Sequence, residues 1–450
     1  MTERGNFGSK IGIVLATAGS AVGLGNIWRF PYMTGQNGGA AFLLMYVACI
    51  MLLGVPGMVS EFIVGRHAQT NAARAYDKLS DGRPWRFVGY LGILTSTIIL
   101  GFYAVVAGWC LQYLYASVAG QVQGDSQYVQ EYFVAFSSNA WKPIVCGLLF
   151  IVMTHLIVVR GVRKGIEKAS KWLMPILLIL LVVLVIASCS LPGAIEGVKF
   201  LLKPDFSKIS GDVLLEALGQ AFFSLSLGTA CLCTYASYFS RTTNLLHSAG
   251  QIALLDTMIA ILSGLLIFPA AASVGIGADS GPSLIFITLP NVFQQAFGSM
   301  PVVGYVVSIM FYALLVFAAL TSTISMHEIG TAFFTEEFQM PRKYAAWVVT
   351  VLAGVLCLLC SWSVGAINIE VMGLSLMDFC DQLTANFMLP VGGMLACLFV
   401  GWYIPRQVVH DEFTNYGQLN HSFYRVYLFA VRYVCPVCII LVFLHQLGIL

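Results

Sequence analysis

One short segment near the N-terminus constrains the fold of this chain more than any other. Residues 19–31 read Gly-Ser-Ala-Val-Gly-Leu-Gly-Asn-Ile-Trp-Arg-Phe-Pro, and they interrupt an apolar run long enough to cross a membrane. Inside a bilayer, backbone leaves a helix only where it is buried in protein or lines a cavity, because lipid offers it no hydrogen-bond partner. We therefore predict a broken membrane helix, and in transporters such breaks lie beside the substrate site.

The composition is that of a membrane protein. Of the 450 residues, 58% are hydrophobic and 10% are charged, whereas soluble domains carry about a quarter charged residues. The net charge of +2 gives no reason to expect a nucleic-acid partner. Almost all of the twelve cysteines fall within apolar segments, so we expect reduced, packed thiols rather than a metal or redox site.

Apolar runs of about 20 residues, the length that crosses a bilayer, can be placed eleven times. They cover approximately residues 11–36, 41–65, 88–118, 143–159, 168–190, 213–239, 245–275, 297–330, 344–362, 372–402 and 424–448. Residues 1–10 are short and polar, so we expect no cleavable signal. Lys and Arg gather in the segments on the side of the N-terminus, which predicts a cytoplasmic N-terminus and an external C-terminus.

The sixth span carries a second interruption. Residues 222–229 read Phe-Phe-Ser-Leu-Ser-Leu-Gly-Thr and stand in register with the first break if the chain holds two five-span halves. The alternative is that these serines only bond their own helix backbone. We predict an all-α, single-domain protein of residues 1–450, with inverted repeats at 11–190 and 213–402 and an extra helix at 424–448.

At these residues the chain resembles the neurotransmitter:sodium symporter family. The motifs that carry the resemblance are Ala21–Pro31, Asn37–Phe42, Pro56-x4-Glu61, Gly65-Arg66, Ser224–Gly228, Thr234–Tyr238 and Leu320–Thr323. They follow in family order over nearly the whole chain. The resemblance implies a bacterial multi-pass protein of the cytoplasmic membrane that couples sodium to symport of an L-amino acid by alternating access. The oligomeric state stays open.

The resemblance implies two sodium sites, both built from the oxygen ligands that a hard cation prefers. The first would use the Ala21 carbonyl, Asn26, Ser224, Asp256 and the carboxylate of the substrate. The second would use the carbonyls of Gly19, Val22 and Ala318 with the hydroxyls of Thr321 and Ser322. For these two hydroxyls the alternative is an ordinary bond to helix backbone.

Gly23 indicates the substrate class. Monoamine members of the family carry a carboxylate side chain at this position, so glycine here implies a substrate that brings its own carboxylate. Tyr103 aligns with the tyrosine that binds this carboxylate. The predicted substrate pocket consists of Ala21, Gly23, Gly25, Ile99, Tyr103, Phe223, Ser224, Ser226, Thr229, Thr323, Ser325 and Met326. Thr229 replaces a large aromatic residue, which predicts room for a hydrophobic or aromatic side chain.

The resemblance also places two gates. Arg29 would close the outer side with Asp378, or alternatively with the neighbouring Asp381. Arg4 and Glu336 would form an inner latch; the members that brace it are Phe7, Ser237 and Tyr238. The alternative is that these are solvated charges at span ends. Gly165-x9-Pro175 predicts a segment of span 5 that unwinds toward the second sodium, with a simple proline kink as the alternative.

Chloride is not expected as a co-ion. Chloride-dependent relatives carry a serine where this chain has Ala260 and a neutral asparagine where it has Asp256. Tyr46, Gln220 and Ser224 match the rest of the anion site, but the Asp256 carboxylate already supplies the negative charge.

Other functional classes find less support. The sequence contains no HExxH, P-loop or G-x-S-x-G motif, and His327-Glu328 lacks a second histidine at metalloprotease spacing, so we do not expect an enzyme. It contains no selectivity-filter motif of the kind that channels use. A non-transporting amino-acid sensor or a sodium-gated, channel-like protein remain the alternatives to a symporter.

Overall fold

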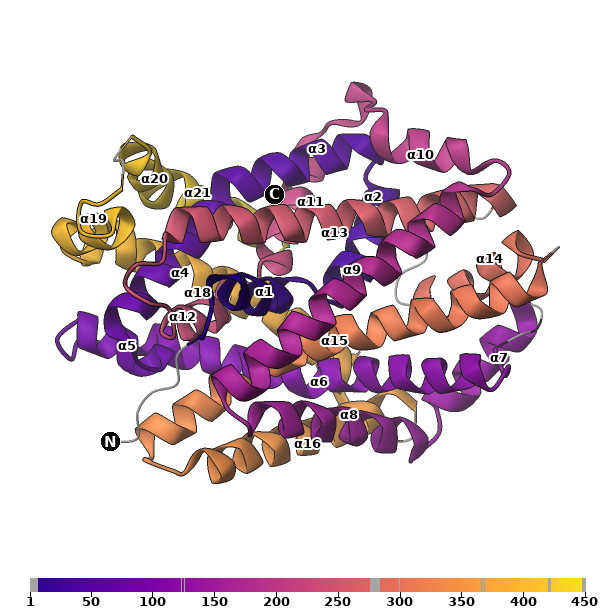
Figure 1. Ribbon diagram of the computed structural model, residues 1–450, viewed down its shortest axis with the longest axis horizontal. Coiled ribbons are helices and arrows are strands. Elements are labelled where there is room, and N and C mark those ends of the chain that lie inside the picture. Colours follow the sequence, from indigo (N-terminus) through magenta and orange to yellow (C-terminus); the bar gives the residue numbers. More distant parts are fainter. Residues whose placement is uncertain are drawn as a thin grey trace.

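The computed structural model describes residues 7–122, 124, 126–275, 284–298, 300–365, 367, 369–419 and 422–446. It is 82% helical, and most of its long helices run along the long axis of the molecule (Figure 1). Helices α5, α12 and α19 lie at one end, which we call the α5 end, and α7, α10 and α14 lie at the opposite end. The predicted all-α class is confirmed.

The elements alternate long helices with short irregular turns. The α-helices of the first part are α1 (Lys10–Ala21), α2 (Phe30–Gln36), α3 (Ala40–Cys49), α4 (Val55–Ala68), α5 (Ala72–Leu79), α6 (Arg86–Val118), α7 (Ser126–Ser137), α8 (Lys142–Val158), α9 (Lys168–Cys189) and α10 (Ala194–Leu202). Those of the second part are α11 (Gly211–Ser224), α12 (Cys231–Ala236), α13 (Leu245–Val274), α14 (Leu289–Ala296), α15 (Pro301–Glu337), α16 (Arg342–Gly365), α17 (Leu376–Gln382), α18 (Leu389–Leu398), α19 (Arg406–Thr414), α20 (Tyr424–Phe429) and α21 (Cys435–Gln446). The π and 3-10 turns are η1 (Gly25–Arg29), η2 (Ile50–Gly54), η3 (Val162–Glu167), η4 (Phe206–Lys208), η5 (Leu284–Thr288), η6 (Leu383–Met388), η7 (Phe399–Tyr403) and η8 (Ala430–Val434). Two short strands, β1 (Glu370–Val371) and β2 (Leu374–Ser375), pair antiparallel.

Eight helices in the described part of the chain are long and apolar enough to cross a membrane. They are Ala40–Ala68, Arg86–Val118, Val162–Cys189, Leu245–Val274, Pro301–Glu337, Arg342–Gly365, Leu376–Tyr403 and Tyr424–His445. Two bent pairs also qualify as broken spans, Lys10–Ala21 with Gly25–Gln36 at 55° and Gln127–Ser137 with Lys142–Val158 at 73°. The molecule is thus a multi-pass membrane protein, while the count of eleven spans stays a prediction.

Both predicted breaks are present. Helix α1 ends at Ala21, Val22 is extended with φ −74° and ψ 108°, and the chain turns helical again from Gly25. The sixth span stops at Ser224 and resumes at Cys231. Between these two residues, Ser226, Gly228 and Ala230 adopt positive φ angles of 53°, 81° and 61°.

Gly228 shows why the second break needs glycine. A Cβ atom at this position would lie 2.4 Å from the Leu389 carbonyl oxygen and 2.7 Å from the Gly393 nitrogen, both in α18. The unwound segment of the sixth span therefore packs directly on the backbone of α18. The first break is equally enclosed, because α1 packs against α9, α13 and α15, near the middle of the bundle in Figure 1.

Candidate functional site

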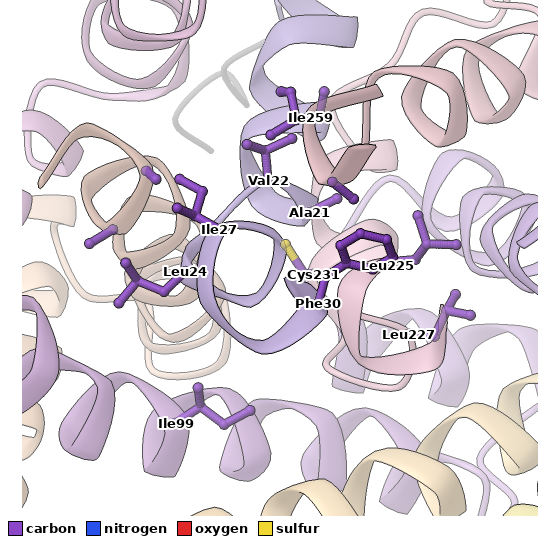
Figure 2. Close-up of a cluster of buried hydrophobic side chains, with 14 of the residues drawn as sticks. Ala21, Val22, Leu24, Ile27, Phe30, Ile99, Leu225, Leu227, Cys231 and Ile259 are labelled. Carbon is purple, nitrogen blue, oxygen red and sulfur yellow. The ribbon is translucent and has the colours of Figure 1, made fainter. Parts of the chain in front are cut away.

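A cavity of about 70 Å³ lies where the two breaks meet α6 and α15. Figure 2 shows Ala21 of the first break on the same side as Cys231 and Leu225 of the second, with Ile99 on the separate helix α6 below them in this view. The cavity is lined by Ser20, Ala21, Gly23, Gly25, Ile99, Phe102, Tyr103, Phe223, Ser224, Ser226, Thr229, Cys231, Ser322, Ser325, Met326 and Leu389. Its walls combine freed backbone with hydroxyl and apolar side chains.

All but one of the predicted substrate residues line this cavity. The exception is Thr323, whose hydroxyl pairs with Thr154 of α8 at 2.8 Å. Successive residues of a helix are rotated by about 100°, so Ser322, Ser325 and Met326 share the face of α15 that lines the cavity while Thr323 turns toward α8. The structure therefore does not bring Thr323 into the pocket.

Four lining residues were not expected from the sequence. Ser20 and Phe102 are direct neighbours of predicted positions, and a wider window around each motif would have included them. Cys231 begins α12, where the second break ends. Leu389 belongs to α18, and no local signal marks it, since only the close packing of Gly228 on α18 brings it to the pocket.

Gly23 leaves no room for a larger side chain. A Cβ atom here would lie 2.5 Å from the Ser322 hydroxyl oxygen and 3.1 Å from the Tyr103 hydroxyl oxygen. The Tyr103 oxygen accepts a hydrogen bond from the Leu24 amide at 3.1 Å, which leaves its own proton able to donate. The pocket therefore presents a hydroxyl donor at the position where an acidic side chain would otherwise stand.

The residues predicted for the first sodium site form one buried cluster. Asp256 is fully buried and accepts hydrogen bonds from the Asn26 amide at 2.7 Å, the Ser224 hydroxyl at 2.9 Å and the Tyr46 hydroxyl at 2.9 Å. Within the described residues no basic side chain pairs with Asp256. A carboxylate held only by neutral donors is an uncompensated buried charge, which fits a nearby cation.

The residues predicted for the second site also converge. The Val22 carbonyl oxygen lies 3.3 Å from both the Thr321 and the Ser322 hydroxyl oxygens, and the Thr321 hydroxyl lies 2.9 Å from the Ala318 carbonyl oxygen. A Cβ atom on Gly19 would stand 3.3 Å from the Thr321 Cβ. Oxygens of Val22, Ala318, Thr321 and Ser322 thus gather where α1 ends against α15, with Gly19 packed beside Thr321, and oxygen ligands suit Na⁺. The alternative for Thr321 is present too, because Ala318 at 2.9 Å and Phe317 at 3.3 Å both belong to its own helix α15.

The carboxylate of Glu61, in α4, binds backbone amides at the second break. It accepts the Gly228 amide at 2.7 Å and the Cys233 amide at 3.4 Å, and the residue is 2% exposed. These amides belong to the unwound segment and to the start of α12, where no helical partner satisfies them. Motif matching placed Glu61 in the family pattern but assigned it no role; an acid inside an apolar span is itself the signal for one.

The predicted outer pair does not form in this conformation. Asp378 is exposed at the start of α17, where it accepts the Ser375 hydroxyl at 2.7 Å. The Arg29 guanidinium stacks 4.4 Å from the centre of the Phe223 ring, and the carboxylates whose charges act on it are those of Asp381 and Glu216. Asp381 stands one turn beyond the capped start of α17 and is exposed as well, and within the described residues Arg29 forms an ion pair with neither acid, so both remain candidates for the outer gate.

The described part of the inner latch shows where Glu336 and Tyr238 lie. Arg4 lies outside the described residues, and Glu336 accepts the Thr70 hydroxyl and the Asn71 amide, each at 2.7 Å. Tyr238, expected to brace the latch, donates to Glu328 at 2.8 Å. Two turns of α15 separate the two acids, which places Glu328 at the level of Tyr238.

Glu328 is the centre of a network that the sequence analysis missed. It is fully buried and forms an ion pair with Arg342, which also donates to the Val158 carbonyl of α8 at 2.8 Å. The missed signal is again a single acid within a long apolar helix. The other expected members lie close by: Phe7 packs edge-on against Tyr238 at 6.2 Å, and the Ser237 hydroxyl bonds the Thr234 carbonyl.

The segment Gly165–Pro175 is helical in this conformation. Gly165 lies in the π-turn η3, and Pro175 lies within α9. A Cβ atom on Gly165 would meet the Ile157 carbonyl oxygen at 2.1 Å, so glycine is required for close packing here. The simple alternative, a proline inside a continuous helix, describes this conformation.

A sodium:neurotransmitter symporter family model matches residues 4–131 and 132–449. The chain belongs to this family. Among its relatives, the sodium-dependent transporter YhdH of Bacillus subtilis is 40% identical over 447 residues, covering 98% of this chain and 97% of that protein. A sodium-dependent transporter of Haemophilus influenzae is 32% identical over 464 residues, covering 99% and 98%. The family consists of multi-pass membrane transporters rather than enzymes.

A solved structure supports the same family assignment. The crystal structure of MhsT in complex with L-phenylalanine matches this transporter with a TM-score of 0.89 and 40% identity, over 98% of this chain and 100% of that one. The architecture predicted from the breaks and motifs is therefore that of a solved relative.

Proposed function

We propose that this family member is a sodium-coupled symporter of L-amino acids with hydrophobic or aromatic side chains. The observation that carries the proposal is the buried Asp256 carboxylate, which has no basic partner in the described residues and lies beside the cavity between two broken helices. A cation at this place would neutralise Asp256 and offer a positive charge to a substrate carboxylate. The L-phenylalanine in MhsT, a relative 40% identical, supports the substrate class.

Recognition of the substrate carboxylate would use Tyr103 and the first break. The free hydroxyl proton of Tyr103 can donate to the carboxylate, and helix ends favour anions at their amide groups. Gly23 excludes an acidic side chain, so the site attracts a substrate that carries its own negative charge. The apolar side chains of Ile99 and Met326 would contact the side chain of the substrate.

Two sodium ions would bind at the oxygen clusters of Asp256 and of Thr321. The first ion would contact the substrate carboxylate directly, so that each raises the affinity of the site for the other. This reciprocity is the physical basis of coupling. No chloride would be needed, because Asp256 supplies the negative charge and Ala260 offers no hydroxyl.

Alternating access would follow from the gates. Arg29 would close the outer side with Asp381 or Asp378, and on the inner side Arg4 and Glu336 would act beside the Glu328 network. The Lys and Arg distribution supports a cytoplasmic N-terminus in the cytoplasmic membrane. The halves 11–190 and 213–402 would be the inverted repeats that move against each other.

Competition between substrates tests this proposal. Unlabelled L-phenylalanine, L-tryptophan and L-leucine should each suppress uptake of radiolabelled L-phenylalanine into proteoliposomes, while the decarboxylated amines phenethylamine and tryptamine should not. The reason is that Gly23 offers an amine no anionic partner. Transport of tryptamine at a rate comparable with that of an amino acid would overturn the assignment.

Tyr103→Phe should weaken substrate binding roughly 10- to 150-fold, because a hydrogen bond to a charged group contributes about 1.5–3 kcal/mol. Scintillation proximity binding of radiolabelled L-phenylalanine measures this change. Tyr115→Phe is the matched control, since Tyr115 lies on the same helix and is 62% exposed. Equal affinities of the two variants would remove Tyr103 from the site.

Replacing chloride with gluconate on both sides of the membrane should leave sodium-driven uptake unchanged. The Tyr46 and Ser224 hydroxyls, which would otherwise be free for an anion, both donate to the Asp256 carboxylate. Initial rates of uptake in matched chloride and gluconate buffers are the measurement. A several-fold lower rate in gluconate would show that chloride takes part.

A further inference from the structure

An apolar groove of about 610 Å³ runs along the outer face of α6 at the α5 end of the molecule. It lies away from the substrate cavity and shares no lining residue with it. We call it the α6 groove, and its walls include Pro84, Phe87, Tyr90, Leu91 and Leu94 on one side and Leu395 of α18 on the other.

The length of the α6 groove matches one leaflet of a bilayer. From Pro84 to Leu94 the chain advances ten residues, which in a helix corresponds to about 15 Å, half of a hydrocarbon core of about 30 Å. Phe87 and Leu94 are 62% and 54% exposed, so the apolar wall formed by α6 is accessible from outside the protein. An extended hydrocarbon chain fits both its length and its chemistry.

The mouth of the α6 groove is basic. The Arg83 guanidinium lies 5.8 Å from the centre of the Tyr403 ring, and that of Arg86 lies 5.7 Å from the centre of the Phe87 ring. Stacking on an aromatic ring leaves the N–H groups at the edge of a guanidinium free for phosphate oxygens. Trp85, between the two arginines, is the residue type that favours the headgroup level of a membrane.

These two charges are not neutralised inside the protein. In the part of the chain that the structure describes, the arginines in ion pairs are Arg66, Arg74 and Arg342. Asp77 and Asp81 are close to the two arginines in the sequence, but within the described residues neither forms an ion pair with Arg83 or Arg86. The mouth therefore keeps two arginines available to an external anion.

We propose that the α6 groove binds an anionic phospholipid, with one acyl chain between α6 and α18 and the phosphate at Arg83 and Arg86. The apolar walls of the groove favour a hydrocarbon chain, and the two arginines at its mouth favour a negative headgroup. Because α18 also carries Leu389, which lines the substrate pocket, the bound chain packs two helices that shape that pocket.

Lipid retention tests the proposal directly. The full chain is reconstituted in vesicles of phosphatidylglycerol or of phosphatidylcholine, extracted gently, and examined by native mass spectrometry and thermal unfolding. We expect phosphatidylglycerol to be retained at several-fold higher occupancy and to raise the unfolding midpoint, with no comparable effect of phosphatidylcholine. Equal retention of the two lipids would overturn the proposal, as would a stabilisation that inorganic phosphate alone reproduces.

Variants separate the headgroup from the chain. Arg83→Ala/Arg86→Ala should lower phosphatidylglycerol retention several-fold, and Leu94→Trp should do the same by filling the groove while leaving both charges in place. The control Arg160→Ala/Arg425→Ala removes two exposed arginines elsewhere and should change nothing. If the alanine pair folds poorly, Arg83→Lys/Arg86→Lys keeps the charges and should retain the lipid. Unchanged retention in Leu94→Trp would contradict the assigned chain position.

Discussion

Asp256→Asn is expected to raise the sodium concentration for half-maximal uptake roughly 10- to 100-fold, since each lost hydrogen bond to a charged group contributes about 1.5–3 kcal/mol. One carboxylate oxygen of Asp256 accepts from Asn26 and Ser224, and the other accepts from Tyr46. An asparagine side chain would direct an NH₂ group at one of these donors. The variant loses the negative charge for the first sodium, and the Tyr46 or Ser224 hydroxyl would have to rotate to accept from the new NH₂ group.

Sodium titration of L-phenylalanine uptake in proteoliposomes measures the effect. Asp212→Asn is the matched control, because Asp212 lies at the start of the same α11 that ends at Ser224 and its side chain is 85% exposed. Adding Ala260→Ser to Asp256→Asn should restore part of the uptake when chloride is present. A sodium dependence identical to that of the unmodified protein would show that Asp256 is only a structural residue.

Arg342→Ala is expected to destabilise the folded protein by about 3–5 kcal/mol, the cost of leaving a buried charge without its partner. Glu328 is fully buried, and without Arg342 its carboxylate keeps the Tyr238 hydroxyl as its one hydrogen-bond donor among the described residues. The α8 carbonyl of Val158 would also lose the Arg342 guanidinium and keep only the Gly161 amide as a donor within the described residues. Loss of this network should loosen α15 from α8 and α16 at the α5 end.

Thermal or denaturant unfolding of the purified protein checks this expectation. Arg342→Ala/Glu328→Gln should recover a large part of the lost stability, because the double variant no longer buries an unpaired charge. Arg160→Ala, an exposed arginine at the same end, is the control and should stay within about 0.5 kcal/mol of the unmodified protein. A single variant as stable as the control would show that the pair contributes little.

The local elements of the site were predictable because their causes are local. Glycine, asparagine and proline within an apolar run predicted the break after Ala21, and serine with glycine predicted the break after Ser224. The clusters at Asp256 and Thr321 could be predicted only through the family resemblance. The spacing of Thr321 and Ser322 by itself is equally compatible with hydroxyls that bond their own helix backbone. In the structure the Thr321 hydroxyl contacts both the Val22 carbonyl and a carbonyl of its own helix, while the Ser322 hydroxyl contacts the Val22 carbonyl.

What the sequence could not predict depends on how helices face one another. Thr323 turns away from the pocket because one residue along α15 changes the face by about 100°. The sequence leaves Asp378 and Asp381 both open as partners of Arg29, and it does not reveal that the Ser375 hydroxyl at the start of α17 donates to Asp378. Leu389 reaches the pocket only through the contact between Gly228 and α18. In each case the deciding contact joins residues far apart in the chain.

The most direct test of the account is concentrative uptake of radiolabelled L-phenylalanine into proteoliposomes under an imposed inward sodium gradient. The account predicts that internal L-phenylalanine rises above its external concentration, and that this accumulation disappears when sodium is equal on both sides or is replaced by potassium. Uptake that only equilibrates, whatever the gradient, would indicate a channel-like protein. Sodium-dependent binding without uptake would indicate a sensor, and either result would contradict sodium-coupled symport.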